Sequence, residues 1–146
     1  MYISIFFLPR SLSHTSAVSE LPKILIVDDS AAMRQAIKLV LKDLAAEIHE
    51  CSDGSEAVVQ YAVRLPDWVL MDIRMKETDG LTAIRQIRTV FPNARIIVVT
   101  ISSGDDMREA ARSAGACAYV VKDNLLDIRH ILVDQGLRWR SEPVAS

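Results

Sequence analysis

Short apolar runs alternate with amphipathic stretches along the chain from Pro22 onward. The apolar runs are of strand length and rich in branched side chains, which is typical of strands buried on both faces of a sheet. They predict strands at residues 23–28, 46–51, 67–72, 95–100 and 118–121. Between the runs, apolar residues recur at helical spacing behind polar residues that can cap a helix. This pattern predicts helices within residues 30–44, 53–65, 81–91, 102–114 and 125–132.

Five strand–helix alternations are typical of an α/β domain that has a parallel sheet with helices on both faces. Right-handed crossovers between parallel strands leave few topologies. Among them we expect a doubly wound, flavodoxin-like sheet of five strands in the order 2-1-3-4-5, counted along the chain. In such folds the binding site lies beyond the carboxyl ends of the strands, near the point between strands 1 and 3 where the order reverses.

The regular pattern indicates one domain, which we place at residues 22–138. Residues 1–21 contain an apolar run too short to cross a membrane, followed by a segment rich in Ser and Thr. We expect these residues to form a disordered or loosely attached extension. Residues 139–146 are expected to form a flexible tail.

The composition restricts the classes of partner. Half of the residues are hydrophobic, and the net charge is -2 with a pI of about 5.9. This balance gives no general attraction to nucleic acid or to an anionic membrane, so we expect neither as a direct partner. Cys51 and Cys117 form no C-x-x-C motif, and we expect small buried residues rather than a metal or redox site. Nothing in the pattern indicates an oxidising compartment, and we expect a cytoplasmic protein.

Polar residues stand at the ends of the predicted strands. Asp28 and Asp29 end the first strand, Asp72 ends the third, Thr100 ends the fourth, and Lys122 follows the fifth. The carboxyl ends of parallel strands meet at one edge of a sheet, so these side chains should lie together. Two carboxylates about 4 Å apart repel by roughly 4 kcal/mol at an effective dielectric constant of about 20, so the cluster needs a compensating cation or has to hold a proton. Oxygen ligands suit a hard divalent ion, and we expect Mg²⁺.

A carboxylate, a magnesium ion and a lysine together are typical of a site for phosphoryl transfer. The carboxylate attacks phosphorus while the positive charges neutralise the phosphoryl oxygens, and the hydroxyl of Thr100 can donate a hydrogen bond to one of them. Each residue alone also has an ordinary interpretation, such as a helix cap for Asp29 or a solvent-exposed charge for Lys122. The prediction therefore depends on four separate elements placing these residues at one edge.

Four segments carry a family resemblance in the expected order and spacing. They are Ile24-Leu-Ile-Val-Asp-Asp-Ser30, Met71-Asp72 with Asp79-Gly80, Val99-Thr100, and Gly115 to Lys122, in which Tyr119 precedes the lysine by three residues. Together they resemble the receiver domain of bacterial two-component response regulators, over about residues 22–135. Each segment alone is weak, but the set is highly specific.

The resemblance implies a role for each matching residue. Asp72 would accept a phosphoryl group from the phosphohistidine of a sensor histidine kinase or of a phosphotransfer protein. Asp29 and Asp72 would bind Mg²⁺, as would the backbone carbonyl of Arg74, and Asp28 would bind it mainly through water. The protein would be a phosphoacceptor signalling domain and not an enzyme, with phosphorylation from a donor and self-dephosphorylation as its only reactions.

The resemblance also implies a conformational switch. Lys122 would contact the phosphoryl group, Thr100 would move toward it, and Tyr119 would turn inward behind it. This change would bias the surface of the fourth helix, fifth strand and fifth helix toward an active state. A downstream protein target would recognise that surface, and the last helix could support a phosphorylation-dependent homodimer.

Three positions depart from the family pattern. Lys76 stands where the family usually has proline, and Asp123 stands where proline usually follows the lysine. Ile101 replaces a residue that is usually small, and we expect its branched side chain to hinder access to the phosphoryl group and to give a slow or selective site. With aspartate after the lysine, this chain resembles receivers that are joined to helix-turn-helix output domains. Only 24 residues follow Lys122, however, and we expect no DNA-binding module.

Two other functions remain open. The first is a receiver-like interaction module that works without phosphorylation, which Ile101 and Lys76 favour and the complete acidic and lysine set disfavours. The second is a flavodoxin-like enzyme, since a fold does not fix a function. Asp28 and Asp29 would repel a flavin phosphate, and Arg74 stands where a phosphatase with an aspartate nucleophile would need a second acid.

Overall fold

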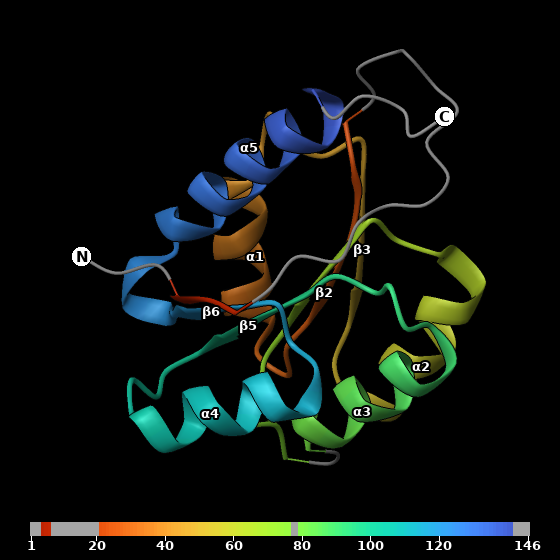
Figure 1. Ribbon diagram of the computed structural model, residues 1–146, viewed down its shortest axis with the longest axis vertical. Coiled ribbons are helices and arrows are strands. Elements are labelled where there is room, and N and C mark those ends of the chain that lie inside the picture. Colours follow the sequence, from red (N-terminus) through yellow and green to blue (C-terminus); the bar gives the residue numbers. More distant parts are fainter. Residues whose placement is uncertain (1–3, 7–20, 77–78, 142–146) are drawn as a thin grey trace.

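The computed structural model describes residues 4–6, 21–76 and 79–141, and it has a sheet between two layers of helices (Figure 1). The strands are β1 (Ser4–Ile5), β2 (Lys23–Val27), β3 (Glu47–Cys51), β4 (Trp68–Met71), β5 (Ile96–Thr100) and β6 (Ala118–Val121). The helices are α1 (Ala31–Val40), α2 (Gly54–Arg64), α3 (Gly80–Val90), α4 (Asp105–Ala114) and α5 (Leu126–Ser141), and a short 3₁₀ turn, η1 (Lys122–Asn124), precedes α5.

The sheet has the strand order β1-β6-β5-β4-β2-β3. Strands β2 to β6 are parallel to one another, and they are the five strands that the sequence predicts. Counted among themselves, they run in the order 2-1-3-4-5, which confirms the predicted α/β doubly wound topology. The central strands β2, β4 and β5 are almost wholly buried, as continuous apolar runs require.

A sixth strand joins the sheet at the edge of β6. Ser4 and Ile5 pair antiparallel with Tyr119 and Ala118, so the sheet is mixed rather than purely parallel. The sequence pattern predicts a disordered or loosely attached extension at residues 4–6 and no strand there. A pairing of two residues has no periodic signal of its own and depends on the edge that accepts it. Residues 1–3, 7–20 and 142–146 lie outside the described part, and the three segment boundaries remain predictions.

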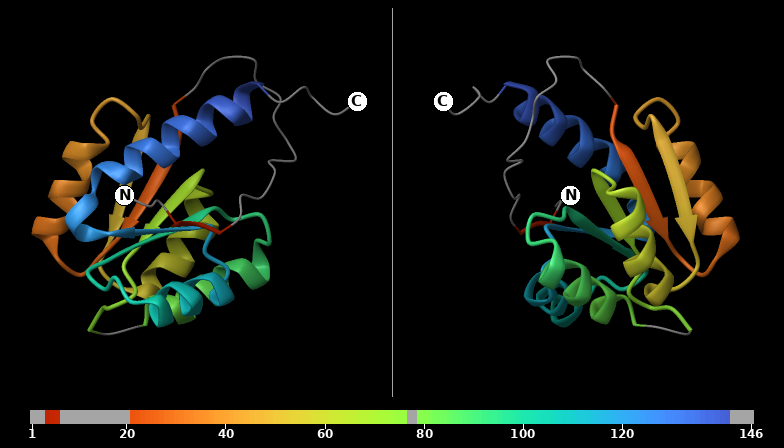
Figure 2. Two further views of the ribbon diagram at one scale, coloured as in Figure 1. Left: turned by 60° about the vertical axis from the view of Figure 1, so that its left-hand side comes forward. Right: turned by 90° about the vertical axis from the view of Figure 1, so that its right-hand side faces the viewer.

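Two apolar cores cover the two faces of the sheet. One lies between the sheet and α2, α3 and α4, and includes Tyr61, Ile84 and Ala111. The other lies between the sheet and α1 and α5, and includes Ile37 and Ile131. Figure 2 shows α5 and α1 on the side of the sheet opposite to α3 and α4. The helix faces that the sequence pattern marks as apolar are therefore the faces that pack on the sheet.

Polar caps fix where the helices begin. The Ser30 hydroxyl accepts a hydrogen bond from the Met33 backbone N–H at 3.2 Å, and Asp53 accepts bonds from two N–H groups of α2. Asp79, which precedes the predicted helix at residues 81–91, caps α3 through the N–H of Leu81. The first helix ends at Val40, before the predicted Leu44, and α4 begins at Asp105 rather than in the Ser102 region.

Two further expectations concern cysteine and the membrane. Cys51 and Cys117 are both buried free thiols, as predicted. Burial raises the pKa of the Cys51 thiol to about 12 and that of Cys117 to about 11. Across residues 4–6, 21–76 and 79–141, no helix is at once long enough and apolar enough to span a bilayer.

Candidate functional site

The predicted site residues lie at the carboxyl edge of the sheet. Asp28 follows β2, Asp72 follows β4, Thr100 ends β5 and Lys122 follows β6. The side chains of Asp28 and Asp72 are almost fully buried, and Thr100 has no exposed surface. Burial of charged groups next to one another is costly unless they are paired, so their joint placement needs a physical explanation.

Lys122 pairs with both buried carboxylates. Its Nζ lies 2.8 Å from Asp28 Oδ2 and 3.1 Å from Asp72 Oδ2. Burial alone would lower the pKa of Lys122, but the hydrogen bond from its ammonium to Asp28 and the charges of Asp72 and Asp28 raise it above its ordinary value. The lysine is therefore charged near neutral pH, and it holds the ends of β2, β4 and β6 together through one ammonium group.

Asp72 is incompletely neutralised in this arrangement. Burial raises the pKa of its carboxyl group, and the nearby charge of Asp28 adds to the rise. The backbone N–H of Arg74, which donates to Asp72 Oδ1 at 3.1 Å, and the ammonium of Lys122 act in the opposite direction but do not cancel the increase. The carboxylate is thus held in place by two donors while its negative charge stays underscreened.

Asp29 completes an acidic cluster. One carboxylate oxygen from each of Asp28, Asp29 and Asp72 lies within 4.8 Å of the others. Asp29 is exposed, and its Oδ2 accepts a hydrogen bond from the backbone N–H of Lys76 at 3.1 Å. Among the described residues, Asp28 Oδ2 has no polar partner besides the Lys122 ammonium against which it is buried. Closely spaced carboxylate oxygens with free lone pairs fit a hard divalent cation.

The loop that carries the acidic pair is fixed by Ser30 and by three residues, Arg34, Lys38 and Glu50, that the sequence pattern did not indicate. The backbone N–H of Ser30 donates to Asp28 Oδ1 at 2.8 Å. Arg34, on the first turns of α1, donates to the backbone carbonyl of Asp28 at 2.6 Å and to Glu50 of β3 at 3.0 Å. Lys38 also pairs with Glu50. The sequence signal for this contact was an arginine one helical turn beyond the Ser30 cap. Side chains on a helix lean back toward its N-terminus, so Arg34 can reach the loop before α1.

Gly80 lets α3 approach the end of β4 closely. A Cβ atom at this position would lie 2.2 Å from the backbone oxygen of Asp72 and 2.7 Å from Cα of Ile73. Asp79-Gly80 belongs to one of the segments that resemble the family. The structure shows that Asp79 caps α3 and that Gly80 packs against the backbone of the residue that bears the central carboxylate.

The two predicted switch residues differ in their surroundings. The Thr100 hydroxyl is buried and has no hydrogen-bond partner among the described residues. Tyr119 is 1% exposed, and its hydroxyl donates to the backbone carbonyl of Ser102 at 2.7 Å. The inward position that the resemblance implies for Tyr119 after phosphorylation is therefore already present in this structure. Ile101, beside Thr100, points its side chain largely to solvent and is 67% exposed.

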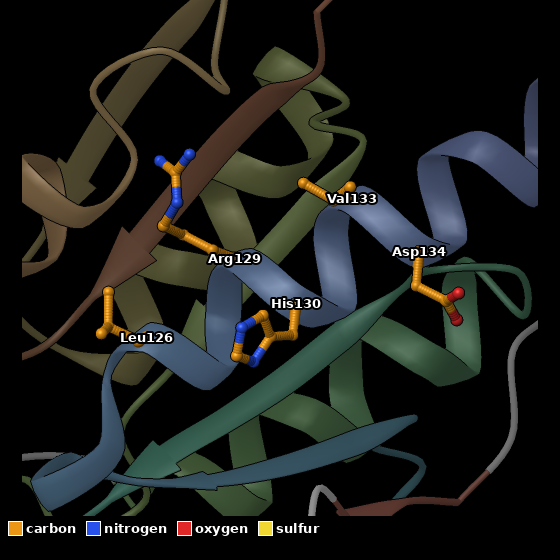
Figure 3. A pocket seen from close by; sticks show the side chains of 5 residues that line it. All are labelled: Leu126, Arg129, His130, Val133 and Asp134. Atoms are coloured by element: carbon orange, nitrogen blue, oxygen red, sulfur yellow. The ribbon is translucent and has the colours of Figure 1, made fainter.

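A separate shallow pocket of about 450 Å³ lies on α5, away from the acidic cluster. In the described part of the chain its lining residues come from this helix, namely Leu126, Arg129, His130, Val133 and Asp134 (Figure 3). Leu126 and Val133 are 63% and 44% exposed, which is high for large apolar side chains. Arg129 reaches to the turn after α1, where it pairs with Asp43 at 2.5 Å. The pocket contains none of the predicted site residues.

Comparison of this chain with known protein families gives a result that agrees with the fold and with the acidic cluster at the sheet edge. Residues 24–132 match the family model of the response regulator receiver domain. The chain therefore belongs to this family, which is a signalling domain of two-component systems, and the resemblance stated from the sequence is confirmed.

Named relatives support the assignment. The chemotaxis protein CheY of Bacillus subtilis is 41% identical over 101 residues, which are 68% of this chain and 84% of CheY. A LuxR-family response regulator from Aurantimonas sp. SI85-9A1 has a similar structure, with a TM-score of 0.71 and 30% identity over 79% of this chain and 87% of that one. The CheX-CheY-BeF3-Mg²⁺ complex from Borrelia burgdorferi matches at a TM-score of 0.67 and 26% identity, covering 76% and 88%.

Proposed function

We propose that this receiver domain accepts a phosphoryl group on Asp72 from the phosphohistidine of a sensor histidine kinase or of a histidine phosphotransfer protein. The observation that carries the proposal is the shared ion pair of Lys122 with Asp28 and Asp72 beside a third carboxylate. A structural ion pair would need one carboxylate for one ammonium. An excess of buried negative charge lowers stability, and it is expected where a site has to bind a cation and a reacting group.

The proposed transfer is a displacement at phosphorus. A carboxylate oxygen of Asp72 forms a bond to phosphorus as the bond from phosphorus to the donor's imidazole nitrogen breaks, and the electron pair of that bond stays on the nitrogen. Lys122 then lies where its ammonium can pair with a phosphoryl oxygen instead of Asp72 Oδ2. The Thr100 hydroxyl, which has no partner within the described residues, can donate to another phosphoryl oxygen.

We propose Mg²⁺ as the cation of this site. Asp29 and Asp72 would bind it, Asp28 would bind it mainly through water, and the backbone carbonyl of Arg74 would be a further ligand. When bound, the ion would neutralise the carboxylates and the charge that develops on the phosphoryl oxygens. The donor set supports this choice, since it offers only oxygen atoms. The relative from Borrelia burgdorferi, whose complex contains BeF3 and Mg²⁺, gives independent support.

The signal would leave the site through protein contacts. We propose that phosphorylation draws Thr100 toward the phosphoryl group and stabilises Tyr119 behind it, which biases the surface of α4, β6 and α5 toward one state. A downstream protein in the cytoplasm would read that surface. The exposed Leu126 and Val133 on α5 also support a homodimer that forms on phosphorylation, because exposed large apolar side chains favour association.

The test is to incubate the purified chain with acetyl phosphate, with and without Mg²⁺, and to read the intact mass. Asp72→Asn is the matched control, because the amide keeps the shape and loses the nucleophile. We expect a phosphoryl adduct that depends on Mg²⁺ and is absent from the variant. An adduct that persists in Asp72→Asn would show that the phosphoacceptor is another residue.

A second candidate is a receiver-like module that acts without phosphorylation. The observation in its favour is Tyr119, which is already buried and bonded to Ser102. If the folded wild-type chain takes no phosphoryl group under conditions that label a known receiver, this second function is supported and the first is refuted.

A further inference from the structure

The edge of β6 has an unusual occupant. Strands β2 to β6 form the expected receiver sheet, in which β6 would be an edge strand. In this chain the edge is taken by Ser4 and Ile5, which pair antiparallel with Tyr119 and Ala118 (Figure 1). Strand β6 has the sequence AYVV, whereas β3 at the other edge has the sequence EIHEC. An apolar edge without charged residues is a template for strand pairing, while a charged edge discourages it.

Three contacts besides strand pairing hold the segment in place. The backbone N–H of Phe6 donates to the carbonyl of Cys117 at 2.7 Å. The side chain of Phe6 is half-buried and packs against the core on the α4 face of the sheet. The guanidinium of Arg108, on α4, donates to the hydroxyl of Ser4. The segment therefore contacts β6, α4 and the core at once.

Arg108 links this segment to Tyr119. Its guanidinium carbon lies 4.7 Å from the centre of the Tyr119 ring, which is within the range of a cation–π contact, while one of its nitrogens bonds to Ser4. The hydroxyl of the same tyrosine is held by the Ser102 carbonyl before α4. Tyr119 thus has three contacts: its backbone pairs with β1, its ring lies under the Arg108 guanidinium, and its hydroxyl donates to the Ser102 carbonyl.

We propose that the edge of β6 is a strand-binding surface, that the segment Ser4–Phe6 of the same chain occupies it in cis, and that this segment regulates the α4–β6 face by holding Tyr119 in its buried position. A few hydrogen bonds and one half-buried aromatic ring gain modestly more free energy than ordering three residues costs, so the segment is mostly bound and its release is accessible. Its release exposes the edge to an extended segment of another protein, which would add to the sheet in the same way.

The test uses the full chain and three substitutions. Phe6→Pro removes the N–H that donates to Cys117 and the aromatic side chain, while the matched control Phe6→Leu keeps an N–H and an apolar side chain. Ser4→Ala removes only the hydroxyl that receives Arg108, and it provides the test if Phe6→Pro fails to fold. Hydrogen–deuterium exchange is followed in fragments that contain β6 and α4. We expect at least roughly tenfold faster exchange in Phe6→Pro, a smaller increase in Ser4→Ala and no change in Phe6→Leu.

A second measurement tests the surface itself. The probe is a fluorescent peptide of residues 1–9 with a lysine tail for solubility, and binding is read by anisotropy. We expect saturable binding to Phe6→Pro that is at least roughly tenfold tighter than binding to the wild type or to Phe6→Leu, because only the first has a vacant edge. Equal binding to all three proteins, or unchanged exchange in both Phe6→Pro and Ser4→Ala, would overturn the proposal.

The oligomeric state separates binding in cis from exchange between two copies. Light scattering that shows a monomer for the wild type supports binding in cis, while a wild-type dimer that Phe6→Pro converts to a monomer overturns it. The regulatory part of the inference rests on the proposed role of Tyr119 as a switch. Neither exchange nor peptide binding uses a phosphodonor, so the failure of phosphorylation at Asp72 would leave these outcomes unaffected.

Discussion

Gly80→Ala would add a methyl group where the structure leaves no room for it. The added Cβ would lie 2.2 Å from the Asp72 backbone oxygen and 2.7 Å from Cα of Ile73. Both are backbone atoms at the end of a central strand, so neither can rotate away as a side-chain tip can. To reach ordinary van der Waals contact, α3 and the end of β4 would have to separate by about 1 Å, although close-packed interiors resist such shifts.

Gly80→Ala has two opposing effects on the free energy of unfolding, a gain in helix propensity and a cost of overpacking. Alanine in place of glycine gains at most about 1 kcal/mol through helix propensity and a less flexible unfolded chain. Overpacking costs about 1–3 kcal/mol, and a backbone contact belongs at the upper end of that range. A shift of α3 also weakens the Asp79 cap at the Leu81 N–H, worth about 1 kcal/mol. We expect a net loss of about 2–3 kcal/mol, or roughly 6–15 °C in the Tm of a domain of this size.

Thermal unfolding followed by circular dichroism, with urea titration at 25 °C, measures both quantities. Gly104→Ser is the matched control, because the nearest atom to its added Cβ is Ser102 Oγ at 3.9 Å and serine is a better N-cap for α4 than glycine. We expect the control to be neutral or stabilising by up to about 1 kcal/mol. If Gly80→Ala melted at the wild-type temperature, the close approach of α3 to Asp72 would be refuted as a constraint on the fold.

Three further outcomes are expected. Leu65→Gly should stabilise the protein by about 0.5–1 kcal/mol in urea titration. Leu65 ends α2 in the left-handed conformation, with a φ of 48°, which is unfavourable for a residue with a Cβ atom but not for glycine. The raised thiol pKa values of Cys51 and Cys117 mean that the folded state disfavours the thiolates. Their contribution to stability should be complete below the unfolded pKa of about 9 and should be lost as the pH rises toward 11–12, with native thiols unreactive to iodoacetamide at pH 8 and reactive in urea. If the proposed function holds, Ile101→Ala should speed phosphorylation from acetyl phosphate or loss of the phosphoryl group severalfold, and unchanged rates of both would refute the expected hindrance.

The sequence predicted the parallel strands and the site residues for the same physical reason. A strand buried on both faces needs a continuous apolar run, and Ile24 to Val27 or Ile96 to Val99 can satisfy no other common environment so well. Once the runs are strands in parallel, the polar residue that ends each run lies at the carboxyl edge. The proximity of Asp28, Asp72 and Lys122 follows from topology and needs no detail of side-chain packing.

Other features depend on tertiary contacts that leave no local signal. The pairing of Ser4 and Ile5 depends on the apolar edge of β6, more than 110 residues later in the chain. Gly80 resembles any turn glycine until α3 is placed against the backbone of Asp72. The inward position of Tyr119 depends on Ser102 and Arg108, which come from the loop before α4 and from α4 itself. In each case the sequence gives the residue type, and the partner becomes apparent only in three dimensions.

The acidic edge and the β6 edge involve the same strand, and this connects the two proposals. Lys122 leaves the end of β6 and pairs with Asp28 and Asp72, while Tyr119, three residues earlier, lies beneath Arg108 and pairs with β1. A four-residue strand moves as a unit, because its backbone hydrogen bonds to β5 hold both ends in one register. A phosphoryl group that draws Lys122 away from Asp72 therefore acts on the strand that β1 covers. If both proposals hold, occupancy of the β6 edge and the charge at Asp72 must be thermodynamically coupled, and each must change the equilibrium of the other by the same factor.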